Sequence, residues 1–114
     1  MFKKIKNPVI DLFAGCGCLS LGLEQAGFTP VYVNELNNDA LKTYQINRSH
    51  LNFLSNNNFY SNDIHELTTG NNLKKLQKNL KKKFNISIGD ISLVVGGPPC
   101  QGYSGIGHRR NYSV

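Results

Sequence analysis

Short apolar runs alternate with polar stretches along the chain and predict four strands. Residues 8–13, 31–33 and 91–95 are mostly apolar and short, which is typical of strands buried within a sheet. A brief extended piece is expected at residues 59–60, inside an Asn- and Ser-rich stretch over 49–62 that otherwise predicts a loop. These runs supply the strands of one small sheet.

Apolar residues between the strands recur at helical spacing and predict three helices. The first follows the loop after the first strand and stops at Gly27, because glycine is common just past a helix end. The second begins at a cap, Asn37 or Asn38, and runs to about Arg48. The third covers residues 73–84, with lysines around its apolar face.

Strands that alternate with helices predict the α/β class, with right-handed parallel crossovers and helices on both faces of an open sheet. A chain of 114 residues makes one small domain, without an internal repeat or linker. Ligands bind such sheets at the carboxyl ends of the strands. The unusual residues fall at those ends: the loop 15–17, Glu35, Asp63 and the loop that carries Cys100.

Composition adds a basic balance to this picture. The net charge is +6 and the pI about 9.4, which is compatible with nucleic acid as a partner. A lysine-rich solvated surface would give the same charge. No apolar run approaches the roughly 20 residues of a membrane span, and no signal peptide is visible, so an intracellular, cytoplasmic protein is expected.

Three cysteines are an odd number for such a protein, so a disulfide framework is not expected. Cys16 and Cys18 have no second Cys or His pair near them, so no metal site is expected either. Nothing in the sequence supplies a partner that would activate either thiol. The two are therefore expected to be small loop residues.

A cofactor site is suggested by glycines after the first strand, which let the backbone approach a ligand closely. The dinucleotide fingerprint requires glycine where this chain has Ser20, and no Walker-type loop is present. Glu35 lies where an acidic residue meets ribose hydroxyls, and Asp63 could accept a hydrogen bond from an exocyclic amino group. Each acid taken singly is equally well a solvated carboxylate. Their joint placement at strand ends favours a nucleoside-binding site.

A nucleophile is suggested by the loop after the last strand. Pro98 and Pro99 stiffen this loop, and glycines on both sides let it pass close to a cofactor and a substrate. Cys100 is held between them, and thiolate is a strong side-chain nucleophile. A buried structural cysteine needs none of this scaffolding, so Cys100 is predicted to be catalytic.

Together these segments resemble cytosine-5 DNA methyltransferases. Residues 11–20, DLFAGCGCLS, are similar to the first motif of that family, and 96–102, GGPPCQG, to its nucleophile loop. Residues 34–36 and 62–64 are similar to two further cofactor segments. The resemblance implies a Rossmann-like S-adenosylmethionine-dependent methyltransferase fold with an incomplete parallel sheet and flanking helices. Residues 1–114 would be the amino-terminal portion of the catalytic domain.

The resemblance also implies roles for individual residues. S-adenosylmethionine would have Phe13 against it, Glu35 on its ribose, Leu36 and Ile64 beside its adenine, and Asp63 on the adenine amino group. Family members usually have glycine where this chain has Cys18, which changes the close contact expected there. The other implied cofactor-binding positions are Ala14, Gly15, Cys16, Gly17, Cys18, Gly97 and Pro99.

For the chemistry, the resemblance makes Cys100 the nucleophile that adds to carbon 6 of a cytosine flipped out of the duplex. Double-stranded DNA is then the substrate, and a bacterial restriction-modification pair is the expected setting. Contacts with DNA are implied for Gln101, Ser104, Arg109 and Arg110.

Later parts of the family pattern have no counterpart in these 114 residues. They include the Glu-Asn-Val segment, an arginine-rich motif and the target-recognition region. The chain alone is therefore expected to be inactive or nearly so, as a fragment or one subunit of a split enzyme whose partner is the remaining portion. Two alternatives stay open: a tRNA cytosine-5 methyltransferase and a non-catalytic cofactor-binding fragment.

Overall fold

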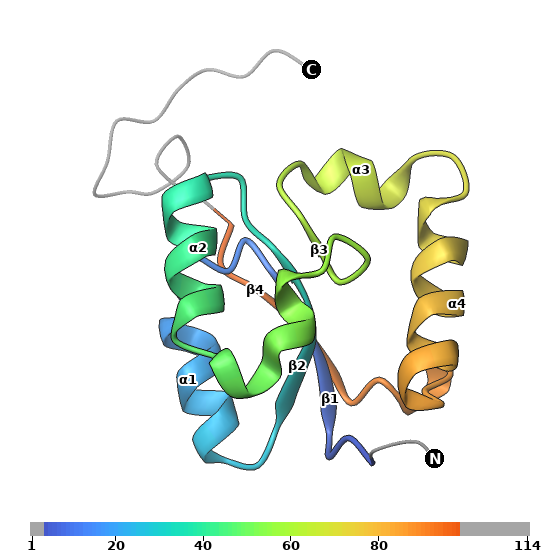
Figure 1. Cartoon of the computed structure of the whole chain (residues 1–114), viewed down its shortest axis with the longest axis horizontal. Helices are drawn as coiled ribbons and strands as arrows, with labels where there is room; N and C mark the ends of the chain where they lie inside the picture. Colours follow the sequence, from blue (N-terminus) through green and yellow to red (C-terminus); the bar gives the residue numbers. More distant parts are fainter. Residues whose placement is uncertain (1–3, 99–114) are drawn as a thin grey trace.

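The computed structural model describes residues 4–98, which form a four-stranded parallel sheet with the strand order β3-β2-β1-β4 (Figure 1). The first two strands occupy the centre, and the last two form the edges. The strands are β1 (Pro8–Leu12), β2 (Thr29–Asn34), β3 (Tyr60–Ser61) and β4 (Leu93–Gly96). The helices are α1 (Cys18–Gln25), α2 (Asn38–Ile46), α3 (Ile64–Thr68) and α4 (Asn72–Phe84), with 3₁₀ turns at Ser49–Ser55 and Ile88–Asp90.

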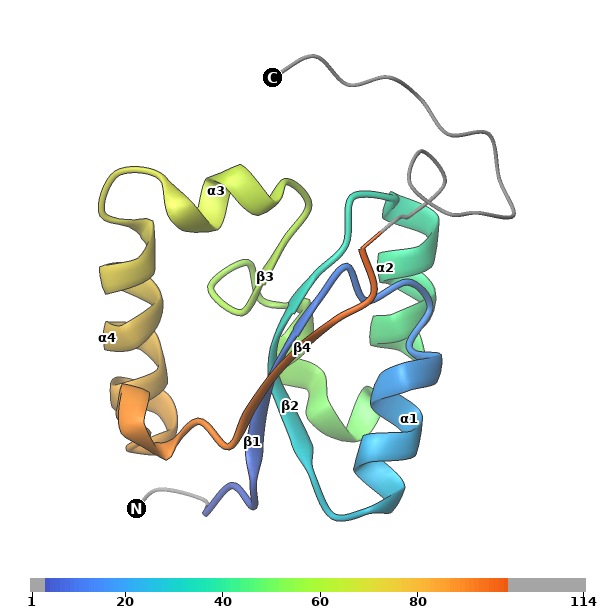
Figure 2. The ribbon, with the colours of Figure 1, turned by 180° about the vertical axis from the view of Figure 1, so that it is seen from behind.

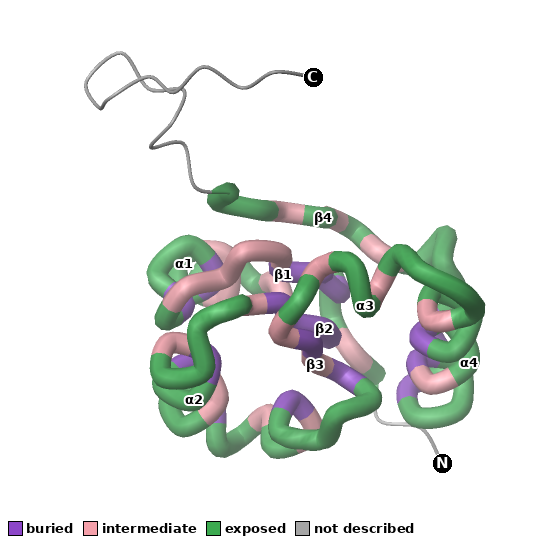
Figure 3. The backbone as a smooth tube through the Cα atoms, turned by 90° about the horizontal axis from the view of Figure 1, so that it is seen from above, coloured by how far each residue is buried: buried purple, intermediate pink, exposed green. Residues whose placement is uncertain are grey.

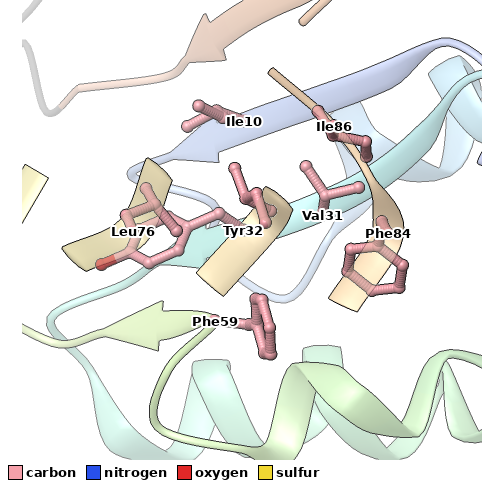
Figure 4. Close-up of a cluster of buried hydrophobic side chains, with 8 residues drawn as sticks. Ile10, Val31, Tyr32, Phe59, Leu76, Phe84 and Ile86 are labelled. Atoms are coloured by element: carbon pink, nitrogen blue, oxygen red, sulfur yellow. The ribbon is translucent and has the colours of Figure 1, made fainter. Parts of the chain in front are cut away.

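Helices cover both faces of the sheet, with α1 and α2 on one face and α4 on the other (Figures 1 and 2). The α4 face holds the larger core, in which Phe59 and Phe84 pack with the strand residues Val31 and Tyr32 (Figure 4). On the other face, Tyr44 belongs to a smaller buried cluster. This arrangement confirms the predicted α/β class and the Rossmann-like sheet with flanking helices.

Burial falls from the centre of the sheet to the β4 edge (Figure 3). In β2, Val31 and Val33 are fully buried, whereas Val94 of β4 is 58% exposed. The cause is pairing, because β4 lies against β1 on one side and has no strand on its other side within residues 4–98. None of the helices in that part of the chain combines the length and apolar character needed to cross a membrane.

The predicted elements are present, with corrections at their ends. The first strand stops at Leu12 and does not include Phe13, whose φ of 52° takes the chain out of the extended conformation. The last strand begins two residues later than predicted, at Leu93. The predicted loop over 49–62 contains a 3₁₀ turn, and α3 was not predicted, because five residues are too few to show helical periodicity.

Candidate cofactor site

The loop after β1 is held in shape by glycines and by the end of β2. Phe13, Gly15 and Gly17 all have positive φ, at 52°, 60° and 104°. The backbone N–H of Phe13 donates to the side-chain oxygen of Asn34 at 3.3 Å, and that of Ala14 donates to the Asn34 carbonyl at 2.9 Å. The loop is therefore bound to the neighbouring strand rather than free in solvent.

Asn34 joins three strand ends through one buried amide, and only 1% of the residue is exposed. Its Oδ1 accepts from Phe13, while its Nδ2 donates to Ser61 Oγ at 3.1 Å and to the Asn62 carbonyl at 3.2 Å. A side chain that both donates and accepts is required here, which asparagine provides. Asn34 was not predicted as a functional residue, although it lies directly before Glu35.

Glu35 fixes the loop against the start of α2. Its Oε1 accepts from the Gly15 N–H at 2.8 Å, and its Oε2 accepts from the Asn37 N–H at 2.8 Å. Asn37 in turn caps α2, because its side chain accepts from Ala40 N at 3.0 Å. Each carboxylate oxygen can accept a further hydrogen bond. Glu35 is thus pre-oriented and keeps acceptor capacity for a ligand hydroxyl.

Asp63 caps α3 at the end of β3, since its Oδ1 accepts from the His65 N–H at 2.9 Å. The side chain is exposed, and its second carboxylate oxygen has no hydrogen bond within residues 4–98. Beside these acids, Leu36 is 75% exposed and Ile64 is partly exposed. Two apolar side chains next to two carboxylates suit a ligand with a flat ring and polar edges, such as an adenosyl group.

These residues surround one cavity of about 690 Å³ at the carboxyl ends of the strands. Seven of the predicted cofactor residues line it. Its lining comprises Phe13, Gly15, Asn34, Glu35, Leu36, Asn37, Asn62, Asp63, Ile64, His65 and Gly97. The volume of the cavity and its carboxylate acceptors, Glu35 and Asp63, fit S-adenosylmethionine. The lining residues Asn37, Asn62 and His65 were not predicted from the sequence.

A second cavity of about 270 Å³ adjoins the first and shares Phe13, Gly15 and Gly97 with it. It is lined by three further predicted positions, namely Ala14, Cys16 and Cys18. Gly17 is buried and lines neither of these two cavities. The remaining predicted site residues lie outside the described residues: Pro99, Cys100, Gln101, Ser104, Arg109 and Arg110.

An ion pair between Arg48 and Glu24 stabilises the loop after β1. Arg48 Nε donates to both carboxylate oxygens of Glu24 at 3.1 Å, and its Nη2 lies 2.8 Å from Glu24 Oε2. The same Nη2 donates to the Gly17 carbonyl at 2.9 Å, and the guanidinium carbon lies 3.8 Å from the centre of the Tyr44 ring. Any side chain at position 17 would meet this guanidinium group, because an added Cβ would lie 2.5 Å from Nη1.

Tyr44 connects that ion pair to β1. Its hydroxyl lies 2.9 Å from Asp11 Oδ2 and 2.9 Å from Ser20 Oγ. Asp11 is 1% exposed, its Oδ1 has no hydrogen-bond partner among residues 4–98, and burial raises the pKa of its carboxyl group. Burial also raises the pKa of the Tyr44 hydroxyl, which therefore stays protonated at neutral pH. These contacts could not be predicted from the sequence, because the partners are 24 to 33 residues apart.

Comparison with known proteins shows the family to which this chain belongs. The profile of the family described as C-5 cytosine-specific DNA methylase matches residues 8–113. The chain belongs to this family. The resemblance found in the sequence is thereby confirmed.

Several relatives are similar to this chain over most of its length. The type II methyltransferase M.AgeI of Thalassovita gelatinovora is 35% identical over 90% of this chain, and M.HgiGI of Herpetosiphon aurantiacus is 38% identical over 88% of it. The DNA (cytosine-5)-methyltransferase PliMCI of Paracentrotus lividus is 34% identical over 98%. The chain spans only part of each: 20% of M.AgeI, 64% of M.HgiGI and 7% of PliMCI.

Proposed function

We propose that residues 1–114 are the amino-terminal portion of the catalytic domain of a DNA (cytosine-5-)-methyltransferase that uses S-adenosylmethionine. The observation that carries this proposal is the cavity at the strand ends, where Glu35, Asp63 and Leu36 meet in a chain of this family. The type II methyltransferase names of several relatives support a role in a bacterial restriction-modification system, in the cytoplasm.

In this proposal the described residues hold and orient the cofactor. Glu35 accepts hydrogen bonds from the ribose hydroxyls with the lone pairs that Gly15 and Asn37 leave free. The Asp63 oxygen that does not cap α3 accepts from the adenine amino group, and Leu36 and Ile64 remove the ring from water. Phe13, Ala14, Cys16, Cys18 and Gly97 line the rest of the cofactor site, and Gly17 shapes the loop. A cofactor contact is proposed for Pro99 as well, which lies outside the described residues. When bound, S-adenosylmethionine supplies an electrophilic methyl group.

Cys100 acts on the other reactant, the cytosine base. Its thiolate adds to carbon 6, breaks the aromaticity of the ring and makes carbon 5 nucleophilic. After carbon 5 has been methylated, loss of its proton and of the thiolate restores the base. The base must leave the stacked duplex to reach this thiolate. Gln101, Ser104, Arg109 and Arg110 contact the DNA backbone, where positive charge and hydroxyl groups bind phosphate.

The remaining portion of the enzyme, in the same chain or a second one, completes the site. It would supply the carboxylate that holds the cytosine and the region that reads the DNA sequence. The chain without it is expected to bind the cofactor weakly and to show little or no transfer. Among residues 4–98, β4 is paired on one side only, and more sheet can be added at its other side.

Trapping with 5-fluorocytosine tests the proposal. The completed enzyme is incubated with S-adenosylmethionine and duplex DNA that contains this base, which has no carbon 5 proton to lose. A covalent protein–DNA adduct that survives denaturing electrophoresis is expected. Unmodified DNA serves as the control, because it releases the enzyme after turnover.

Two results would contradict the assignment. The nucleophile is wrong if Cys100→Ser still forms the adduct, and the substrate is wrong if only tRNA with the same base is trapped. Calorimetry of S-adenosylmethionine with the chain alone addresses the remaining alternative. Tight binding without any adduct from the completed enzyme would favour a non-catalytic cofactor-binding fragment.

A further inference from the structure

Two thiols lie side by side in the loop that lines the candidate cofactor site. Cys16 Sγ and Cys18 Sγ are 3.9 Å apart, and both residues are exposed. They line the smaller of the two adjoining cavities. The sequence showed no partner for either thiol, whereas the fold places the two thiols next to each other.

The backbone on both sides of Cys16 is fixed by hydrogen bonds from other parts of the chain. Gly15 N donates to Glu35, and the Gly17 carbonyl accepts from Arg48. Cys18 is the first residue of α1, so its backbone is fixed by the helix. The two sulfur atoms are therefore held near each other by the fold.

We propose that Cys16 and Cys18 are a reversible modification site, at which a low-molecular-weight disulfide such as glutathione disulfide converts the two thiols into an intramolecular disulfide. The proposal has a second part, which rests on the proposed function: the disulfide form binds S-adenosylmethionine more weakly. Exposed disulfides are the labile ones in proteins, because reductants reach them easily.

The exchange balances without any further reactant. One cysteine thiolate attacks a sulfur of glutathione disulfide, forms a mixed disulfide and releases one glutathione thiolate. The second cysteine thiolate then attacks the protein-side sulfur of the mixed disulfide and releases the second glutathione. The protein loses two electrons and two protons, and one glutathione disulfide becomes two glutathione thiols.

The electrostatic surroundings set the pace of this exchange. Contact with the Cys16 thiol raises the pKa of the Cys18 thiol, and the positive charge of Arg48 opposes that rise. Thiolate is the attacking species, so the exchange is expected to become faster as the pH rises above neutral. Attack by the Cys18 thiolate is therefore expected to be slower at neutral pH than attack by an ordinary cysteine.

Disulfide formation would change the cofactor site because the sulfur atoms must approach from 3.9 Å to about 2.05 Å. The disulfide closes a small ring through residues 16–18, and its narrow geometry restrains the backbone between the two cysteines, so the loop is expected to shift. Gly15, which donates to Glu35, lies directly before Cys16 and lines both cavities. A shift of the loop is thus passed to the cavity that holds Glu35.

Mass spectrometry of the Cys100→Ser chain tests the modification. That variant leaves Cys16 and Cys18 as the only two cysteines of the chain. Incubation of the folded, reduced protein with glutathione disulfide is expected to lower the protein mass by the mass of two hydrogen atoms. Matched variants that also carry Cys16→Ser or Cys18→Ser should gain one glutathione instead.

A parallel sample in urea guards against a trivial result, because any unfolded chain with two nearby cysteines can be oxidised. The proposal is overturned if the disulfide forms only in urea. It is also overturned if the protein, shown to be folded by circular dichroism, accumulates the mixed disulfide with glutathione and does not form the disulfide between Cys16 and Cys18.

Calorimetry of reduced and oxidised Cys100→Ser protein tests the second part. Oxidation is expected to weaken S-adenosylmethionine binding by about tenfold, and the cofactor should make the disulfide easier to reduce by the same factor, since coupling is reciprocal. Equal affinity of the two forms would refute the coupling. For this comparison the remaining portion of the enzyme is present, so that the cofactor site is complete. An enzyme so completed that binds in neither form would refute the proposed function instead, while the mass result still decides the modification site.

Discussion

Replacing Arg48 by methionine would test whether its guanidinium group stabilises the glycine loop and the two helices beside it. The substitution keeps an unbranched side chain of similar reach and removes the charge. Glu24, whose side chain is 17% exposed in the fold, would lose its ion-pair partner, and the Gly17 carbonyl would lose its hydrogen bond. Tyr44 would lose the cation above its ring.

The expected loss follows from the burial of this pair. Removing one partner of a buried ion pair costs about 3–5 kcal/mol, because the other charge stays behind unpaired. The Gly17 hydrogen bond is part of the same network, so its loss is not added to that figure. A domain of this size has about 5–15 kcal/mol of stability in total. Arg48→Met should therefore remove a large share of it, about 3 kcal/mol or more.

Urea unfolding followed by circular dichroism measures this loss, and two further variants show its cause. Arg48→Lys keeps the charge but lacks the planar guanidinium fork that donates to Glu24 and the Gly17 carbonyl, so an intermediate loss is expected. The double variant Glu24→Gln with Arg48→Met removes both charges and should recover part of the stability lost in Arg48→Met. The reasoning would be refuted if Arg48→Met cost under about 1 kcal/mol, the value typical of an exposed pair.

Three more outcomes are expected from the same structure. Gly17→Ala should lower the free energy of unfolding in urea by about 1–3 kcal/mol, because the φ of Gly17 is 104° and the new Cβ would meet Arg48. The control Gly22→Ala lies at an open helical position and should be neutral or stabilise by up to about 1 kcal/mol. The unfolding free energy of the wild type relative to Asp11→Asn should fall as the pH rises above about 3.8 and level off beyond the folded-state pKa. The pKa of Asp11 is raised in the fold, so the folded state binds the proton more tightly; a flat difference across the titration would contradict this. Asn34→Ala should cost about 2 kcal/mol or more and Asn34→Asp a comparable amount, because aspartate cannot donate; equal stability of wild type and Asn34→Asp would refute the role of Nδ2.

The sequence predicted the features that local patterns carry. The apolar run before Phe13 identified the first strand, and the glycines after it identified a loop at the sheet's carboxyl edge. Glu35 and Asp63 were located because acidic residues directly after short apolar runs are unusual there. The family was reached from the same segments, together with the loop around Cys100.

Features that depend on distant partners could not be predicted. Phe13 ends an apolar run and was therefore predicted as a strand residue. Its positive φ accompanies a hydrogen bond to Asn34, 21 residues later. Arg48 looked like the polar end of a helix, whereas the fold brings it to Glu24, 24 residues earlier. Both features were missed because a contact across a sheet or between helices does not change the local sequence pattern around either partner.

The amide of Asn34 also limits how this sheet could be re-engineered. Its oxygen points at a backbone N–H of the first loop and its nitrogen at acceptors after the third strand, so the group works in one orientation only. A loop transplanted onto β1 would have to present its own N–H at the place of Phe13. A transplant without it would leave a buried acceptor unpaired, and the junction would fail even if every new loop residue were well chosen.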